Sequence, residues 1–214
     1  MLVIPVINCR DSETAAIQIN KAVKFIPPAG WIHIDVSDGK FAPVATWGKP
    51  SDLAIIKKIH AQLHFEIHLM VQDPESVIAS WLGAGADRVI VHLETMKDHG
   101  FILDAARRHS AEVMLAIVPA TPVENLIPYL SSFTAFQVLA VVPGPSGQKF
   151  VQGMEDKVRF LQKYRPTALI EVDGGVTLEL CKLVREAGAE AVASATYIFG
   201  SPDPREAYGK LANC

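Results

Sequence analysis

Eight short runs rich in β-branched and other apolar residues recur along the chain, and amphipathic stretches separate them. The runs cover residues 2–7, 31–36, 64–71, 88–94, 113–118, 137–142, 168–172 and 189–194. The stretches that carry apolar residues at helical spacing are residues 13–25, 74–82, 101–109, 155–164 and 178–187. Strands and helices are therefore predicted to alternate along the chain.

This alternation predicts parallel strands joined by crossover helices. Eight units without a distinct second half favour closure into a barrel over an open doubly wound sheet, and no GxGxxG motif opens the first helix. The 214 residues contain no linker, low-complexity segment or block of like charge that would mark a boundary. We therefore expect an α/β fold, a single (β/α)8 TIM barrel, with one domain over residues 1–214.

The composition limits the partners. Hydrophobic residues make up 50% of the chain and charged residues 20%, which suits a large core beneath a hydrated surface. The formal net charge is -3 and no basic stripe with interleaved aromatic residues is present, so we expect no nucleic-acid partner. No apolar run could span a membrane and residues 1–11 do not resemble a signal peptide, which predicts a cytoplasmic protein without a membrane partner. Barrels of this kind often associate, so we expect a homo-oligomer.

The three cysteines, Cys9, Cys181 and Cys214, are far apart and show no CxxC spacing. This odd number indicates neither a disulfide framework nor a thiolate zinc site. We expect three reduced thiols.

Polar residues interrupt the predicted strands with a period of two. Because side chains of a strand alternate between its faces, His33, Asp35 and Ser37 share one face, and the isoleucines and valines between them share the other. The apolar face needs the helical layer for burial, so the polar face must point into the barrel. By the same argument, further residues should point into the barrel. They are Glu66, His68 and Met70 of the third strand, His92 and Glu94 of the fourth, and Glu171 and Asp173 of the seventh.

Imidazoles and carboxylates in a dry interior are costly unless they are paired, hydrated or bound to a cation. His33, Asp35, His68 and Asp173 form a mixed nitrogen and oxygen set that suits one divalent metal ion: zinc, iron, manganese or cobalt. The alternative is that each is an interior residue satisfied by hydrogen bonds. For His92 and Glu94 we weigh a role in orienting the metal ligands against a satisfied core pair.

Small residues collect in the loops after the sixth, seventh and eighth strands. Such residues let backbone N–H groups approach an anion, and barrels commonly bind phosphate at the loops after strands seven and eight. The candidate phosphate cradle is Gly144, Ser146, Gly147, Gly174, Gly175 and Ser194. Taken singly, each glycine favours a turn over a ligand contact, and only the convergence of three loops supports the cradle.

Four strings of residues resemble the ribulose-phosphate 3-epimerase family, in the family's order and nearly from end to end of the chain. They are HIDVSDG at residues 33–39, HLMV at 68–71, PG with GQ at 143–148, and VDGG at 172–175. Each string is weak alone, whereas the ordered set is specific. The resemblance implies a barrel with one divalent cation bound at His33, Asp35, His68 and Asp173.

The resemblance also implies a reaction. Asp35 and Asp173 would be the catalytic acid-base pair that inverts C3 of a ketose phosphate, most simply D-ribulose 5-phosphate to D-xylulose 5-phosphate. One carboxylate would remove the C3 proton, and the other would return a proton to the opposite face of a cis-enediolate. A cation beside the developing oxyanion would act as a Lewis acid, and two opposed carboxylates meet the need for an acid and a base on either side of a planar intermediate.

Several positions depart from the family pattern around the substrate. Val6 follows Pro5 where the family has a sugar-contacting serine; Asn8, on the same face, could replace that contact, or it could cap a helix or satisfy a core group. Met70 keeps one expected methionine, while Ser37 and Leu139 stand where two others are expected.

The phosphate loops depart as well. Pro145 and Ser146 replace a Phe-Gly pair, and Ser194 and Ala195 replace a Gly-Ser pair. These changes spare every expected metal ligand, so they bear on the sugar more than on the reaction. The candidate substrate-binding residues are His68, Met70, Gly144, Pro145, Ser146, Gly147, Gly174, Gly175, Ser194, Ala195 and Asn8.

Other functions compete with this one. The enzyme could epimerise another ketose phosphate of the allulose 6-phosphate type. A hexulose-phosphate synthase would carry an Asp-x-Lys-x-x-Asp cluster, and residues 33–38 lack its lysine. A non-catalytic sugar-phosphate-binding relative is the third possibility, because Val6 and the phosphate loops are altered.

Overall fold

Each of the eight runs overlaps one of eight parallel strands, and each strand pairs with the next to close a barrel; the sixth strand begins two residues before its run and ends at Leu139. The computed structural model describes residues 1–214. The strands are β1 (Leu2–Ile7), β2 (Trp31–Ser37), β3 (His64–Met70), β4 (Arg88–His92), β5 (Glu112–Ile117), β6 (Ala135–Leu139), β7 (Leu169–Asp173) and β8 (Ala191–Ser194). They follow the order β1 to β8 around the barrel, and β8 pairs with β1. The predicted (β/α)8 TIM barrel is confirmed.

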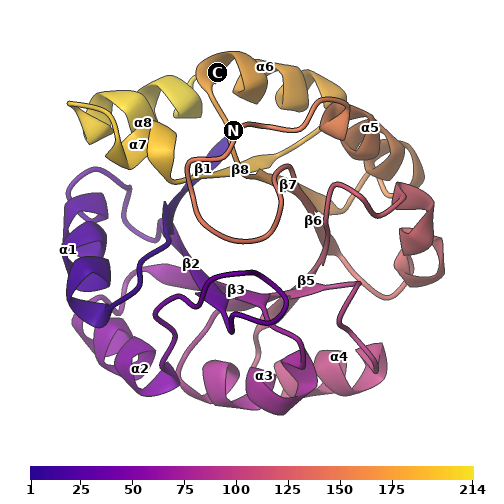
Figure 1. Ribbon diagram of the computed structural model, residues 1–214, viewed down its shortest axis with the longest axis horizontal. Coiled ribbons are helices and arrows are strands. Elements are labelled where there is room, and N and C mark those ends of the chain that lie inside the picture. Colours follow the sequence, from indigo (N-terminus) through magenta and orange to yellow (C-terminus); the bar gives the residue numbers. More distant parts are fainter.

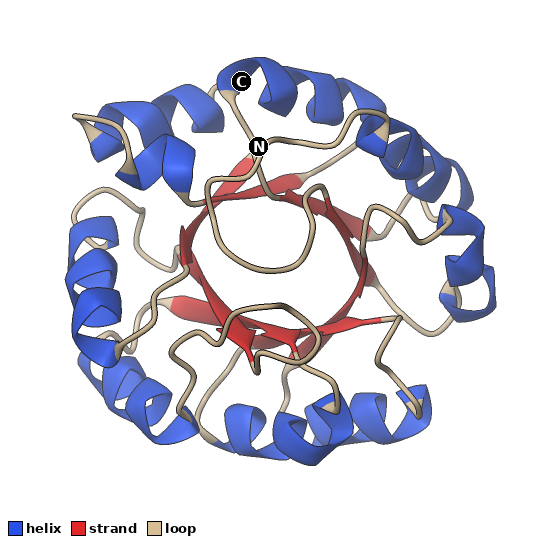
Figure 2. Cartoon of the chain, viewed as in Figure 1, coloured by secondary structure: helices blue, strands red, loops and turns tan.

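Helices form a ring outside the strands (Figure 1, Figure 2). They are α1 (Ser12–Ala22), α2 (Pro50–Ile59), α3 (Pro74–Gly83), α4 (His99–Arg108), α5 (Met154–Tyr164), α6 (Leu178–Ala187), α7 (Thr196–Phe199) and α8 (Pro204–Ala212), with a 3-10 helix η1 (Val123–Tyr129) between β5 and β6. The first helix ends at Ala22, not at Phe25 as expected from its apolar spacing. The other four predicted helices match to within two residues at each end.

Side-chain alternation separates two interiors. The large core lies between the sheet and the helices and contains the outward residues of the strands, such as Ile32, Ile34 and Ile67, which are fully buried. Inside the barrel, a small apolar cluster of Ile90, Met114, Ala116 and Ala135 lies apart from that core. The remaining inward positions include buried polar side chains, so the barrel interior is where the chemistry of this chain collects.

The register aligns the polar residues of neighbouring strands. Asp35 of β2 pairs with His68 of β3, and His33 pairs with Glu66. The loop after β2 and the loop after β6 both extend over the end of the barrel (Figure 1). Active sites of this fold lie at that end, where the strands finish at their carboxyl termini.

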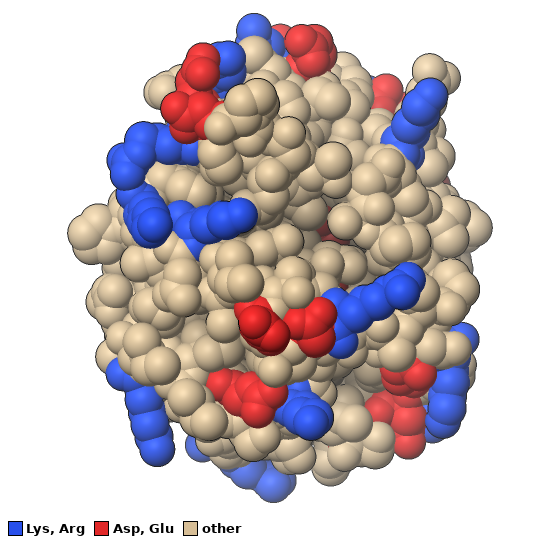
Figure 3. Space-filling model, turned by 60° about the vertical axis from the view of Figure 1, so that its left-hand side comes forward, with Lys and Arg blue, Asp and Glu red and all other residues tan.

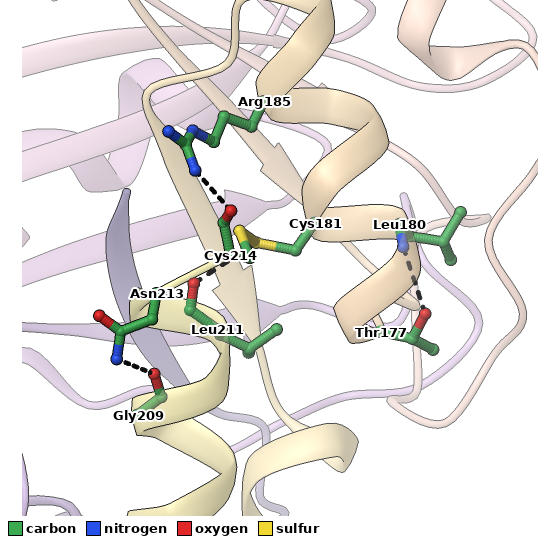
Figure 4. The surroundings of a disulfide bond; sticks show 8 residues. All are labelled: Thr177, Leu180, Cys181, Arg185, Gly209, Leu211, Asn213 and Cys214. Atoms are coloured by element: carbon green, nitrogen blue, oxygen red, sulfur yellow. Dashed lines mark hydrogen bonds between the residues drawn. A yellow bond between two sulfur atoms is a disulfide. The ribbon is translucent and has the colours of Figure 1, made fainter.

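Two of the three cysteines form a disulfide, so the expectation of three reduced thiols is wrong. Cys181 on α6 is bonded to Cys214, the residue at the end of the chain, with their Cα atoms 6.2 Å apart (Figure 4). The crossover topology packs α8 against α6, which brings together residues separated by 33 positions. The Arg185 guanidinium donates a hydrogen bond to the Cys214 carbonyl (Figure 4). Cys9 is a free and buried thiol.

The surface carries both signs of charge. On the face shown in Figure 3, acidic and basic side chains lie among one another, separated by broad uncharged areas. Several charged side chains of the helices form ion pairs, as Arg159 does with Asp156 on α5 and Lys210 with Glu206 on α8. None of the helices has the length and apolar character needed to span a bilayer.

Candidate active site

Four side chains from three strands converge at the carboxyl end of the barrel. Nε2 of His33 lies 3.1 Å from Oδ1 of Asp35, and Nδ1 of His68 lies 3.0 Å from the same oxygen. Oδ2 of Asp173 lies 4.0 Å from Nε2 of His33 and 3.6 Å from Nδ1 of His68. One ligand atom from each residue thus falls within 4.8 Å of all the others. The convergence expected from strand parity is present.

The other nitrogen of each histidine is held by a hydrogen bond. Nδ1 of His33 lies 2.7 Å from Oε1 of Glu66, to which it donates its proton. Nε2 of His68 contacts Nε2 of His92 at 2.8 Å, and Nδ1 of His92 contacts Oε2 of Glu94 at 3.2 Å. Metal-binding histidines are characteristically oriented in this way. The donor set and its supports therefore fit one divalent metal ion, and His92 and Glu94 form a hydrogen-bonded chain behind the ring of His68.

A second layer of charge lies beneath the four residues. Nη1 of Arg88 donates to Oε2 of Glu66 at 2.8 Å, while its Nε and Nη2 atoms bind Glu112 at 2.9 and 2.7 Å. Oε1 of Glu171 accepts from Gln137 at 2.9 Å, and its other oxygen is buried without a partner. This layer fixes Glu66, and through Glu66 it fixes the ring of His33.

The pKa values of Asp35 and Asp173 are shifted in opposite directions. Burial opposes ionisation of Asp35, but hydrogen bonds with His33 and His68 lower its pKa below the ordinary range. Burial raises the pKa of Asp173 to about 7; the nearby His33 opposes this rise and the Asp35 carboxylate adds to it. Paired carboxylates with pKa values pushed apart are the arrangement expected of an acid and a base.

The pKa values of His33 and His68 are also shifted in opposite directions. Burial lowers the pKa of His68 to about 4, so its imidazole is neutral at pH 7 and has a lone pair for a cation. Burial would lower the pKa of His33 too, but its hydrogen bonds to Asp35 and Glu66 raise that pKa well above 6.5. In the cation-free protein His33 therefore carries the positive charge of the cluster.

A pocket of about 520 Å³ opens beside Asp173, among the loops that follow β6, β7 and β8. Its lining includes Gly144, Pro145, Ser146, Gly147, Gly174, Gly175, Ser194 and Ala195, which are the predicted residues of these loops. His68, Met70 and Asn8 lie outside this lining. Helix α7, which begins at Thr196, follows directly after β8 and also borders the pocket.

Two of the glycines are required by the backbone itself. Gly174 has φ +102° and a Cβ there would lie 2.5 Å from Cγ2 of Val141. Gly175 has φ +67° and a Cβ there would lie 2.5 Å from the backbone nitrogen of Phe150. The loops after β6 and β7 thus approach closely enough to demand glycine whether or not an anion binds.

Met70 and Asn8, two further candidate substrate-binding residues, lie outside the pocket lining and contact other parts of the chain. Met70 is buried and pairs with Ser37 across β2 and β3. The Ser37 hydroxyl donates to the carbonyl of Val44 at 2.5 Å, so it is engaged with the loop after β2. Asn8 donates to Oδ2 of Asp35 at 2.7 Å. Asn8 does not cap α1, because Asp11 performs that function by accepting from the backbone nitrogen of Thr14.

Sequence reasoning missed part of the pocket and of its support. Gln148, Lys149 and Thr196 also line the pocket, and Lys149 is an exposed cation at its edge. The only signal for Lys149 was its place directly after the small-residue loop. Arg88 gave no signal, because its partners Glu66 and Glu112 are distant in the sequence and only the register brings them together.

Comparison with known proteins agrees with this geometry. The model of the Ribulose-phosphate 3 epimerase family matches residues 6–199. The chain belongs to this family. It is 34% identical to the ribulose-phosphate 3-epimerase of Schizosaccharomyces pombe over 86% of this chain and 81% of that protein. It is 36% identical to the enzyme of the same name from Chlamydia muridarum over 80% of this chain and 77% of that protein.

Solved structures show the same fold at lower identity. The 3-hexulose-6-phosphate synthase from Salmonella typhimurium matches with a TM-score of 0.75 and 17% identity, over 100% of this chain and 97% of that one. At this identity the likeness concerns the barrel alone. The family assignment confirms the expected resemblance and the expectation of an epimerase, and the cluster of His33, Asp35, His68 and Asp173 could hold the expected metal ion.

Proposed function

We propose that this protein is a metal-dependent epimerase that interconverts D-ribulose 5-phosphate and D-xylulose 5-phosphate by inversion at C3. The observation that carries the proposal is that Asp35 and Asp173 reach one cluster from separate strands, β2 and β7. A base and an acid from different sides are what inversion requires, because a single group cannot serve both faces of a planar intermediate.

In this proposal Asp35, the ionised carboxylate, removes the C3 proton, and the electron pair moves toward the C2 carbonyl to give a cis-enediolate. Asp173, which reaches the cluster from β7, returns a proton to the opposite face. The roles exchange in the reverse direction. His33, Asp35, His68 and Asp173 would hold the divalent cation, which would supply Lewis-acid stabilisation of the negative charge that develops beside C3.

The phosphate group is assigned to the pocket beside Asp173. Gly144, Gly147, Gly174 and Gly175 line this pocket, and the loops after the last strands are where barrels commonly bind phosphate. Lys149 adds a positive charge at the edge. The sugar would then extend from this pocket toward Asp173 and Asp35.

Purified protein given D-ribulose 5-phosphate tests the proposal. We expect D-xylulose 5-phosphate to form, activity to be lost with a chelator and restored by a divalent cation, and Asp173→Asn to lower kcat by about 10²- to 10⁴-fold, the usual contribution of one acid-base group. Full activity of Asp173→Asn would remove this residue from the mechanism.

A different ketose phosphate is the second candidate, supported by the substrate shell. Val6 lines the phosphate pocket, and the Ser37 hydroxyl is bonded to Val44. A panel of phosphorylated ketoses distinguishes the candidates, and a higher kcat/KM on a hexulose phosphate of the allulose 6-phosphate type would reassign the substrate. Solvent deuterium appears at C3 of the substrate only if the protein turns over, so a merely sugar-phosphate-binding relative would show none.

We also propose that the protein forms a homo-oligomer. Three isoleucine side chains on neighbouring helices are at least half exposed to solvent. They are Ile17 of α1 at 50%, and Ile55 and Ile59 of α2 at 58% and 67%. Exposed apolar side chains on adjacent elements suit an interface between copies. Light scattering of the purified protein tests this, and a monomer at micromolar concentration would refute it.

A further inference from the structure

Asn8 joins two parts of the site that are distant in the sequence. It follows directly after β1, and its side-chain nitrogen Nδ2 donates to Oδ2 of Asp35 at 2.7 Å and to the carbonyl oxygen of Gly144 at 3.2 Å. A primary amide has two N–H groups, so both contacts form at once. One amide group therefore bridges the carboxylate on β2 and the loop after β6.

The contact to Asp35 completes the immobilisation of that carboxylate. Its Oδ1 atom faces the nitrogens of His33 and His68 at 3.1 and 3.0 Å, and Oδ2 is the oxygen that Asn8 holds. Within the chain, no other side chain hydrogen-bonds to Oδ2. Removal of the Asn8 amide would leave this oxygen free to rotate away from its position.

The contact to Gly144 reaches the phosphate pocket. Gly144 lines that pocket, and its φ of +145° is one that other residues rarely adopt. A Cβ on Gly144 would lie 3.4 Å from Cδ of Pro43, so the loop after β6 also meets the loop after β2 at this point. A shift of the Gly144 backbone upon anion binding would therefore act on Asn8 directly.

From this geometry we propose that Asn8 is a positioning residue that couples occupancy of the phosphate pocket to the placement of the Asp35 carboxylate. The inference rests on the proposed epimerase function. It assigns Asn8 a role through Asp35 and Gly144, in place of the direct sugar contact considered from the sequence. The substrate phosphate orders Gly144, and the Asn8 amide then holds the Asp35 carboxylate in position to remove the C3 proton.

Deuterium exchange at C3 tests the coupling on two substrates. D-ribulose 5-phosphate is compared with D-ribulose, which lacks the phosphate and is assayed with and without inorganic phosphite as a separate anion. In the wild-type enzyme, phosphite should accelerate exchange into D-ribulose. The variants are Asn8→Leu, which keeps the branching of the side chain but has no hydrogen-bonding atom, and Asn8→Ala; Asn20→Leu, at an exposed position on α1 with no side-chain hydrogen bond, is the matched control.

We expect both Asn8 variants to lower kcat on D-ribulose 5-phosphate by about 10- to 100-fold, as for the loss of a hydrogen bond to a charged group, and to abolish the acceleration by phosphite. Thermal stability and metal content identify any variant that has lost its fold. Acceleration by phosphite that persists in the folded variants, or that is absent in the wild type, would overturn the coupling. A wild-type enzyme without exchange on any ketose phosphate would overturn the proposed function itself, and the inference with it.

Discussion

The Nε2 atoms of His68 and His92 lie 2.8 Å apart inside the barrel. If Nδ1 of His68 is to offer its lone pair to a cation, Nε2 must carry the ring proton and donate it to His92. His92 then donates from Nδ1 to Glu94 at 3.2 Å. Glu94 also accepts from the backbone of Val118 at 3.0 Å, and its pKa is lowered to about 2, since the hydrogen bonds to His92 and Thr121 outweigh the effect of burial.

This relay predicts that His92 supports metal binding without touching the metal. His92→Leu should weaken affinity for the divalent cation by about 10- to 100-fold, the usual effect of removing a group that orients a ligand. Competition with a chelator of known affinity measures this. His109→Leu, at an exposed position after α4, is the matched control and should bind as the wild type does. Equal affinities in the two variants would refute the relay.

Metal binding should release protons. The pKa of His33 is raised well above 6.5 in the cation-free protein, and a protonated imidazole cannot bind a metal. Affinity should therefore fall as pH is lowered, by up to about tenfold per pH unit for each proton released. Titration calorimetry in two buffers of different ionisation enthalpy counts the protons. Binding with no proton release between pH 6 and 7 would contradict the charge state assigned to His33.

The buried Glu171 carboxyl should make the free energy of unfolding fall as pH rises. Burial raises its pKa to about 8, with the charge of Glu66 acting in the same direction, from an ordinary value of 4.5. The raised value means that the stabilising contribution is present below pH 4.5 and is lost as pH rises toward 8. Each pKa unit corresponds to about 1.4 kcal/mol, so the loss is on the order of a few kcal/mol.

Glu171→Gln keeps the shape but has no proton to lose, so the metal-free variant should gain stability over the metal-free wild type between pH 5 and pH 8. Urea unfolding of both proteins at the two pH values measures the difference. Stability curves that stay parallel across this range would show that the pKa of Glu171 is not raised in the folded protein.

The disulfide should stabilise the chain against unfolding. It closes a loop of 33 residues, for which the chain-entropy account gives at most about 3 to 4 kcal/mol. Reductant or Cys214→Ser should lower the melting temperature, and reductant should have no further effect on the Cys214→Ser protein. A wild-type melting temperature that does not respond to reductant would contradict the bond. Because the cytoplasm normally keeps such thiols reduced, the predicted cytoplasmic location calls for this measurement.

Strand parity made the site predictable. His33 and Asp35 are two residues apart, which fixes them on one face, and closure of a parallel barrel brings the ends of β2, β3 and β7 to the same rim. The identity of the four candidate metal residues followed from these two facts and from the family resemblance. No further information about side-chain packing was needed.

Contacts that depend on packing could not be predicted in this way. Cys181 and Cys214 meet only because α8 folds back on α6, and a spacing of 33 residues says nothing about distance. Asn8 shares the parity of a sugar-contacting position, but its rotamer directs the amide to Asp35 and Gly144. The direction of a side chain at the end of a strand depends on the loops around it. The sequences of those loops have no periodic pattern from which this direction could be predicted.

We propose that His33, Asp35, His68 and Asp173 hold one cation. Crystals grown with Zn²⁺ and measured at the zinc absorption edge would locate this cation. We expect one anomalous peak per chain in contact with these four residues, and no such peak in His68→Leu. A peak placed instead among His33, Glu66 and Glu171, the other buried group with the donors for a metal, would refute the assignment, as would crystals that show no peak.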